Sequence, residues 1–135
     1  MKFKYSTVIY KNTSDLIKKL EELGYKRTGN YYEEDCYIYT TQDGYYRSGY
    51  SLDYKDEKPI YIFCGSNSEL FLAIAAMRED SDKFQYFVRN KDLSLVNQGI
   101  YAPKGSFSYS LVDEFPNQDN EYHKANLEEI IKYFK

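Results

Sequence analysis

The segment YIFCGSNSEL, residues 61–70, contains the most direct candidate for nucleophilic chemistry in the chain. Cys64 ends a strand-like run, and the loop after it leads into an apolar helix, whose first backbone amides could bind an anion and lower the pKa of a thiol. Phosphatases built this way need Arg at the sixth position after the Cys, which here is Leu70. A phosphate-binding P-loop needs Gly-Lys followed by Ser or Thr, and this loop has no Lys.

A structural interpretation accounts for the same residues. Ser66 at the N-cap and Glu69 three residues later have the spacing of a capping box, which stabilises a helix by about 1 kcal/mol. Cys64 then behaves as a small apolar side chain of the core. We therefore expect this segment to be a capped entry into a core helix and assign it no catalytic residue.

A catalytic Cys-His or Ser-His pair would have to use His123, the single histidine of the chain. It lies in a polar stretch before the last helical segment, where a solvated side chain is expected. Two cysteines, Cys36 and Cys64, and one histidine lack the close spacing of a zinc site. We expect neither a metal nor a cofactor.

Three groups of carboxylates could bind a hard cation or act as acid and base. They lie within residues 33–35, 53–57 and 79–82. Each also has the composition of an ordinary charged loop or helix end, and no EF-hand pattern is present. We expect them to be solvated surface groups.

The segment GYYRSGY, residues 44–50, is the strongest candidate for a binding surface. Aromatic faces next to a planar cation can bind a nucleotide or anchor a protein interface. The alternative is cross-strand tyrosine packing on a hairpin, with Arg47 extending into water. Two distant arginines could join the same ligand pocket if they lie on the same side. The candidate binding residues are therefore Tyr45, Tyr46, Arg47, Tyr50, Arg78 and Arg89.

Alternating and β-branched residues predict the strands that would carry these side chains. Residues 5–10 form a strand, and residues 31–54 form a hairpin in which Asp43-Gly44 indicates a type I′ turn. Residues 60–64 have the composition of a buried central strand. Further strands are predicted at 84–88 and as short pieces between 93 and 112, and residues 115–124 are predicted to be a loop.

Apolar spacing predicts three helices. The first follows NTSD, carries Leu16 and Leu20 on one face and ends at Gly24. The second covers about residues 67–78 and is apolar nearly all round, so we expect it to be buried. The third begins after Asn126, which lies at capping-box spacing from Glu129.

The predicted order is β-α-β-β-β-α-β-β-β-α. Consecutive strands joined by hairpin turns favour a mostly antiparallel sheet packed by three helices, which is an α+β fold with one buried central helix. At 135 residues the chain is expected to form one domain over residues 1–135.

Composition excludes several classes of function. A net charge of −3 provides no general attraction for nucleic acid, so nucleic acid is an unlikely partner. The chain contains no apolar run of membrane-spanning length, and its first residues do not have the pattern of a signal peptide. Two cysteines suit a reducing compartment. We expect a soluble, cytoplasmic protein with no membrane partner.

Three segments carry a resemblance to known proteins: NTSDLIKKLEELGY, CGSNSELFLAIAAMREDSDKFQYFV and HKANLEEIIKYFK. Together they resemble small uncharacterised proteins encoded by tailed bacteriophages and prophages. The shared motifs are structural in kind and carry no catalytic residues to this chain. What the resemblance implies is a small accessory protein that binds a host or antiviral-defence component.

These observations favour a non-catalytic binding protein that binds a host protein or sequesters a nucleotide-like ligand. An enzyme acting on a nucleotide or phosphate ester is one alternative, and a homo-oligomeric assembly component is another.

Overall fold

The computed structural model describes residues 3–29, 36–49 and 61–135. These residues form three helices and ten strands in mostly antiparallel sheets, so the predicted α+β class is confirmed. The helices are α1 (Ser14–Glu22), α2 (Ser68–Ala75) and α3 (Leu127–Phe134). The strands are β1 (Ser6–Tyr10), β2 (Lys26–Arg27), β3 (Tyr37–Thr40), β4 (Tyr45–Gly49), β5 (Tyr61–Phe63), β6 (Tyr86–Arg89), β7 (Leu93–Leu95), β8 (Ile100–Ala102), β9 (Phe107–Tyr109) and β10 (Tyr122–Lys124). Two single-turn 3-10 helices cover Val96–Gln98 and Gln118–Asn120.

The largest sheet has five strands in the order β2-β4-β3-β1-β5. Strands β3 and β4 form the predicted antiparallel hairpin, and β1 pairs antiparallel with β3. The flanking pairs, β1 with β5 and β2 with β4, are parallel. The outer parts of the predicted hairpin, residues 31–35 and 50–54, lie outside the described residues.

The expectation that residues 60–64 form a buried central strand is wrong. Strand β5 lies at an edge of the five-stranded sheet, and the side chain of Phe63 is 55% exposed. A continuous apolar run is typical of a strand buried on both faces, but an edge strand with aromatic side chains on an outer face produces the same run.

The turn between β3 and β4 also differs from the predicted type I′ turn. Asp43 does not have the positive φ that this type requires at both central residues, and Gly44 alone has it, at 90°. Thr41 N–H donates to Tyr45 O at 2.8 Å, which makes a longer, three-residue loop. A Cβ at Gly44 would lie 2.6 Å from the ring of Phe3, so packing and φ both require glycine there.

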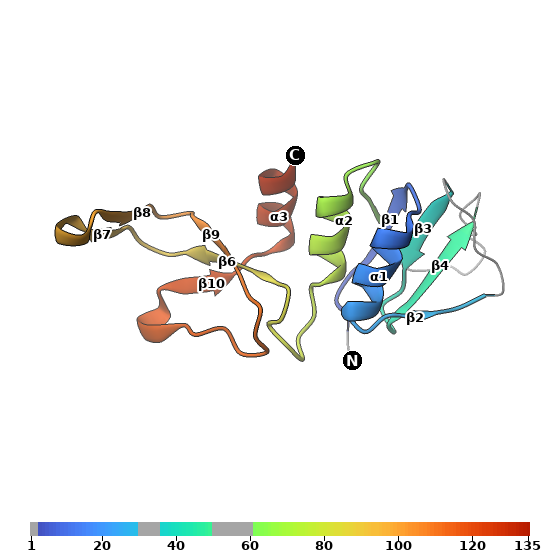
Figure 1. Ribbon diagram of the computed structural model, residues 1–135, viewed down its shortest axis with the longest axis horizontal. Coiled ribbons are helices and arrows are strands. Elements are labelled where there is room, and N and C mark those ends of the chain that lie inside the picture. The colour runs from blue at the N-terminus through green and yellow to red at the C-terminus, as the bar shows by residue number, and fades with distance from the viewer. Residues whose placement is uncertain (1–2, 30–35, 50–60) are drawn as a thin grey trace.

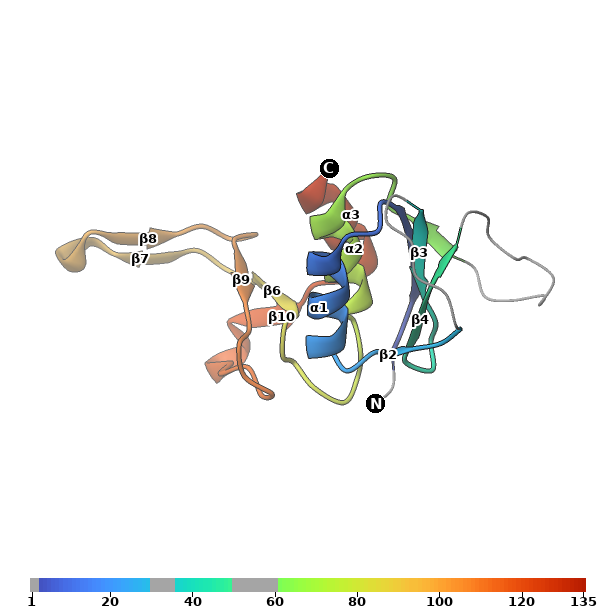
Figure 2. The same ribbon diagram turned by 45° about the vertical axis from the view of Figure 1, so that its right-hand side comes forward.

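The helices lie on one face of the five-stranded sheet (Figure 2). Helix α2 packs against β1 and lies between α1 and α3 (Figure 1). Phe71, Ile74 and Ala75 of α2 are fully buried in a core that also includes Ile9 from the sheet and Ile130 from α3. The prediction of one buried central helix is confirmed.

Side-chain caps fix where the helices begin. Thr13 caps α1, and α3 has the predicted capping box between Asn126 and Glu129. The predicted cap of α2 is wrong by one residue, because the Asn67 side chain, and not Ser66, accepts from Leu70 N–H at 3.1 Å. A run of Ser, Asn and Ser offers three residues that favour the N-cap, and sequence alone does not select among them.

The second half of the chain builds two further sheets instead of extending the first. Strand β6 lies between β10 and β9, and β7 pairs with β8 in a two-stranded arm. In both views this arm extends away from the helices (Figures 1 and 2). Residues 122–124, expected to belong to a loop, form β10. Their alternation was too short to predict a strand, and pairing with β6 stabilises them.

In the part of the chain that the structure describes, no helix combines the length and apolarity needed to cross a bilayer.

Candidate functional site

The hairpin residues predicted to bind a partner are divided between the two faces of the sheet. Tyr45 and Arg47 alternate with Tyr46 along β4, so they point to opposite faces. Tyr46 is buried among the helices, and its hydroxyl donates to Glu21 Oε1 of α1 at 3.1 Å. Tyr45 and Arg47 are exposed on the face that the helices leave uncovered. Tyr50 lies outside the described residues.

Strand register extends this outer face across the sheet. Arg47 is paired with Tyr39, Tyr39 with Val8, and Val8 with Phe63. Paired residues point to the same side of a sheet, so these side chains share the face of Tyr45. We call this surface the aromatic face and define it by Tyr10, Tyr37, Tyr39, Tyr45, Tyr61, Phe63 and Arg47.

The rings of the aromatic face contact one another across strands. The Tyr10 and Tyr37 ring centroids lie 4.7 Å apart edge to face, and those of Tyr37 and Phe63 lie 6.1 Å apart. The guanidinium carbon of Arg47 lies 5.7 Å from the centroid of Tyr39, within the range of a cation–π contact. These contacts hold the rings in a defined arrangement on β1, β3 and β5.

Exposure along the aromatic face is uneven. The centre of the aromatic face is shielded from solvent, because Val8 and Tyr39 are buried. Tyr10 and Phe63 are 52% and 55% exposed, and Tyr45 is 41% exposed. An exposed cluster of large aromatic side chains with one Arg is a composition typical of interface anchors.

Arg78 does not join this surface. Its side chain is buried after α2, where Nη2 donates to Lys83 O at 2.8 Å and Nη1 donates to Ala76 O at 3.3 Å. Its Nε lies 3.4 Å from Asp80 Oδ1, close enough for an ion pair but without the alignment of a hydrogen bond. The guanidinium therefore closes the turn that follows α2.

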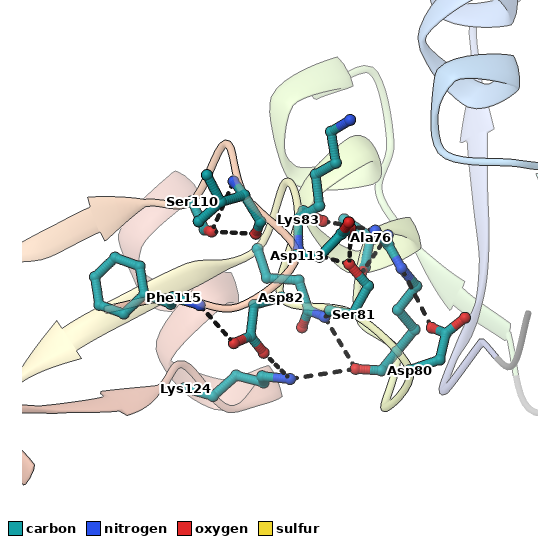
Figure 3. Close-up of polar contacts among 12 residues, drawn as sticks. Ala76, Asp80, Ser81, Asp82, Lys83, Ser110, Asp113, Phe115 and Lys124 are labelled. Carbon is teal, nitrogen blue, oxygen red and sulfur yellow. Dashed lines mark hydrogen bonds and ion pairs between the residues drawn. The ribbon is translucent and has the colours of Figure 1, made fainter. Parts of the chain in front are cut away.

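The acidic residues beside Arg78 hold the same junction together (Figure 3). Asp82 accepts from the backbone N–H of Phe115 at 2.9 Å and pairs with Lys124 Nζ at 3.0 Å. Ser81 donates to Asp113 Oδ1 at 2.7 Å. Asp82 thus joins the turn after α2 to the second sheet, while Asp80 pairs with Arg78 within that turn. The other two acidic groups, 33–35 and 53–57, lie outside the described residues.

Arg89 is also structural. It is buried on β6, where Nε donates to Lys91 O and Nη1 donates to the Tyr122 hydroxyl, each at 3.1 Å. Its guanidinium carbon lies 5.0 Å from the Tyr122 ring centroid. Arg89 therefore fixes the base of the arm, and its strand β6 lies far along the molecule from β4, which carries Tyr45 and Arg47 (Figure 1).

The thiol of Cys64 is positioned as a core group. It is buried against the sheet, with Sγ 3.0 Å from Thr7 Oγ1. Burial raises the pKa of the Cys64 thiol, and the hydrogen bond from Thr7 offsets only part of that rise. A raised pKa reduces the thiolate fraction at neutral pH, which opposes a nucleophilic role.

His123 lies on β10 and contacts both neighbouring elements. Its Nδ1 is 2.5 Å from Asn90 Oδ1, and its Nε2 is 2.9 Å from Glu129 Oε2 of the α3 capping box. The imidazole is therefore held between an amide and a carboxylate, and neither is the Cys or Ser of the catalytic pairs considered above. Within the described residues, no group of three or more His, Cys, Asp or Glu side chains could hold a metal ion.

Sequence reasoning missed five residues of the aromatic face: Tyr10, Tyr37, Tyr39, Tyr61 and Phe63. Their types were visible, and they alternate correctly within their own strands. Which strands are neighbours in the sheet was not visible, and only the order β3-β1-β5 brings these rings together.

Comparison of the chain with protein-family models, curated proteins and solved structures finds no match in any of the three.

Proposed function

We propose that this protein is a non-catalytic binding protein that engages a protein partner through its aromatic face. The observation that carries the proposal is the exposure of Tyr10 and Phe63, at 52% and 55%, on the sheet face opposite the helices. Large rings left in water at this density are costly unless a partner covers them. A host or defence component, the class of partner that the resemblance to phage proteins implies, is the partner we propose.

The backbone of β5 supports a protein partner rather than a small ligand. In a parallel ladder, one residue of each pair forms the hydrogen bonds, and they go to the two residues that flank its partner in the other strand. In the pair of Val8 and Phe63 that residue is Val8, because Cys64 N–H donates to Val8 O at 2.7 Å. The N–H and C=O of Phe63, which is paired with Val8, therefore point away from β1, along the sheet edge. An extended segment of a partner could add a strand at this edge while its side chains contact the rings.

The candidate nucleophiles support a non-catalytic role. Burial raises the pKa of the Cys64 thiol, and His123 is held by Asn90 and Glu129 rather than by a Cys or Ser side chain. Occupation of a partner's surface requires neither group.

Paired variants test this proposal. Tyr10→Ser combined with Phe63→Ser removes the two most exposed rings of the aromatic face, while Tyr101→Ser removes an exposed ring elsewhere as the control. We expect stoichiometric co-purification of one partner with the wild type and with Tyr101→Ser, and its loss from the double variant. A bound nucleotide, seen as excess absorbance at 260 nm released on heating, would overturn the assignment to a protein partner.

A further inference from the structure

A groove lies on the helical side of the molecule and shares no residue with the aromatic face. Its walls come from α1, α2, α3, β6 and β9, and its volume is about 470 Å³. Helix α2 contributes Glu69, Leu72, Ala73 and Ala76, whose spacing of three or four residues places them on one face of the helix. The short side chains of the two alanines leave room beside α2. The volume lies in the ~300–1,000 Å³ range of sites that hold small molecules.

Aromatic rings line the groove opposite α2. The ring of Tyr86 lies at the centre of a cluster, with the ring centroids of Tyr109, Phe134 and Tyr133 at 4.9, 5.2 and 6.2 Å. Tyr109 and Tyr133 are 47% and 53% exposed, so the cluster is open to solvent. Several aromatic faces around one space attract a cation through their quadrupoles, and proteins use such clusters to bind ammonium groups.

One lining residue has a strained backbone. Phe84 has a φ of 66°, in the left-handed region that bulky residues rarely adopt. Its N–H donates to Ser110 O at 2.7 Å, and its ring stacks on that of Tyr109 with centroids 6.2 Å apart. Strain of this kind persists where the surroundings impose it and is concentrated at ligand sites. The Phe84 ring already binds a cation, because Lys83 Nζ lies 5.1 Å from its centroid, which leaves the tyrosine rings for a ligand.

Carboxylates outnumber cations along the groove. Glu22 and Glu69 line it, and Lys19 is the one cation among the lining residues. Within the described residues, no ion pair engages either carboxylate.

Both carboxylates act on the tyrosines of the ring cluster. Burial and, after it, Glu22 raise the pKa of Tyr109 against a smaller opposing effect of Arg78. Burial raises the pKa of Tyr86 to about 12, with smaller contributions from Tyr109, Tyr133 and Glu69. The phenols therefore stay neutral near pH 7, and the negative charge and the ring faces share one space.

We propose that the groove binds a small organic cation, an ammonium group carried on an apolar body. The ammonium group lies against the tyrosine rings and the two carboxylates, and the apolar body contacts Leu72 and Ala73 on α2. A neutral ligand of the same shape gains no attraction from the carboxylates, and an anion is repelled by them. Because this site is separate from the aromatic face, its occupancy does not depend on a protein partner bound there.

Three probes with the same body and different charge test the proposal: 3-phenylpropylamine, which is an ammonium ion at about pH 7, 3-phenylpropanol and 3-phenylpropionate. Titration of the full chain followed by amide NMR shifts should give a dissociation constant below about 1 mM for the amine. We expect the alcohol to bind at least roughly 10-fold more weakly and the propionate not to bind. The shifts should centre on Leu72, Ala73 and Tyr109. Equal affinity for amine and alcohol would overturn the proposal, and so would shifts confined to Tyr10 and Phe63 of the aromatic face.

Charge variants test which groups attract the cation. Glu22→Gln combined with Glu69→Gln should weaken binding of 3-phenylpropylamine by roughly 10-fold, and Lys19→Gln should strengthen it by about 3-fold. Glu114→Gln combined with Glu128→Gln is the matched control, since it makes the same change of net charge outside the lining and should leave the affinity unchanged. All five residues are exposed, so the variants retain the core. Equal weakening by the two double variants would reduce the effect to net charge and overturn the proposal.

Discussion

At the residue scale, chemical type was a poor guide to role in this chain. Arg47 was predicted to bind as part of the hairpin surface, and Arg78 and Arg89 were expected to join it only if they lay on the same side. The structure buries Arg78 and Arg89, which donate to backbone carbonyls. Arg47 is exposed and lies over the ring of Tyr39. A sequence separates a structural arginine from an exposed one only where it also predicts burial. Positions 78 and 89 each follow an apolar segment, and how deeply such a segment is buried depends on the tertiary fold.

Replacement of Arg78 by Met measures this structural role. The change leaves the buried carbonyl of Ala76 and that of Lys83 without their donor, so we expect the free energy of unfolding to fall by about 3 kcal/mol. Arg47→Met is the matched control and should lower it by no more than about 1 kcal/mol. Urea denaturation followed by circular dichroism gives both values, and similar losses in the two variants would contradict the assignment.

Tyr86 makes alkaline stability a second test at this scale. Burial, with smaller effects from Tyr109, Tyr133 and Glu69, raises the pKa of Tyr86 from 10.0 to about 12. Between these values the unfolded chain releases a proton that the folded protein keeps, so the free energy of unfolding falls as pH rises from about 10 towards 12.

Tyr86→Phe removes this contribution. The wild type should therefore lose more stability than the variant over that interval, and the difference between the two proteins should be constant from about pH 7 to pH 9. Denaturation at a series of pH values provides the comparison. Parallel curves for the two proteins above pH 10 would show that Tyr86 ionises equally in both states.

At the scale of elements, periodicity predicted which segments form helices and strands. Tertiary packing decided where these elements end and which strands pair. The three helices and the β3–β4 hairpin were predictable because each has a local signal: an apolar stripe, a capping residue or a glycine turn. The position of β5 at a sheet edge and the existence of β10 depend on pairing with β1 and β6, and neither has a local signal.

The start of α2 provides a quantitative test of one corrected element. Asn67 accepts from Leu70 N–H, and its amide also donates to the carbonyl of Phe134 at 2.7 Å, which ties α2 to the end of α3. We expect Asn67→Ala to destabilise the protein by about 2 kcal/mol, and Ser66→Ala, at the exposed neighbouring position, by less than about 0.5 kcal/mol. Thermal unfolding compares the two, and a larger effect of Ser66→Ala would restore the original assignment of the cap.

At the scale of the whole molecule, helices cover one face of a five-stranded sheet and leave aromatic side chains on the other. The second sheet extends this body into an arm. The α+β class followed from the order of elements, but the division into separate sheets did not, because strands of three or four residues do not specify their partners. Of the residues predicted to form a binding surface, Tyr45 and Arg47 lie on the aromatic face that the strand order assembles, and whether this face binds a partner stays a prediction.

The central claim is that the aromatic face binds a protein partner. A photo-cross-linking amino acid at position 63, introduced into the full chain and activated in the cells that naturally produce the protein, tests it most directly. We predict one dominant cross-linked partner protein, whose yield falls sharply when Tyr10→Ser is added and is unchanged by Tyr101→Ser. No cross-linked protein from position 63, or a yield indifferent to Tyr10→Ser, would contradict the claim.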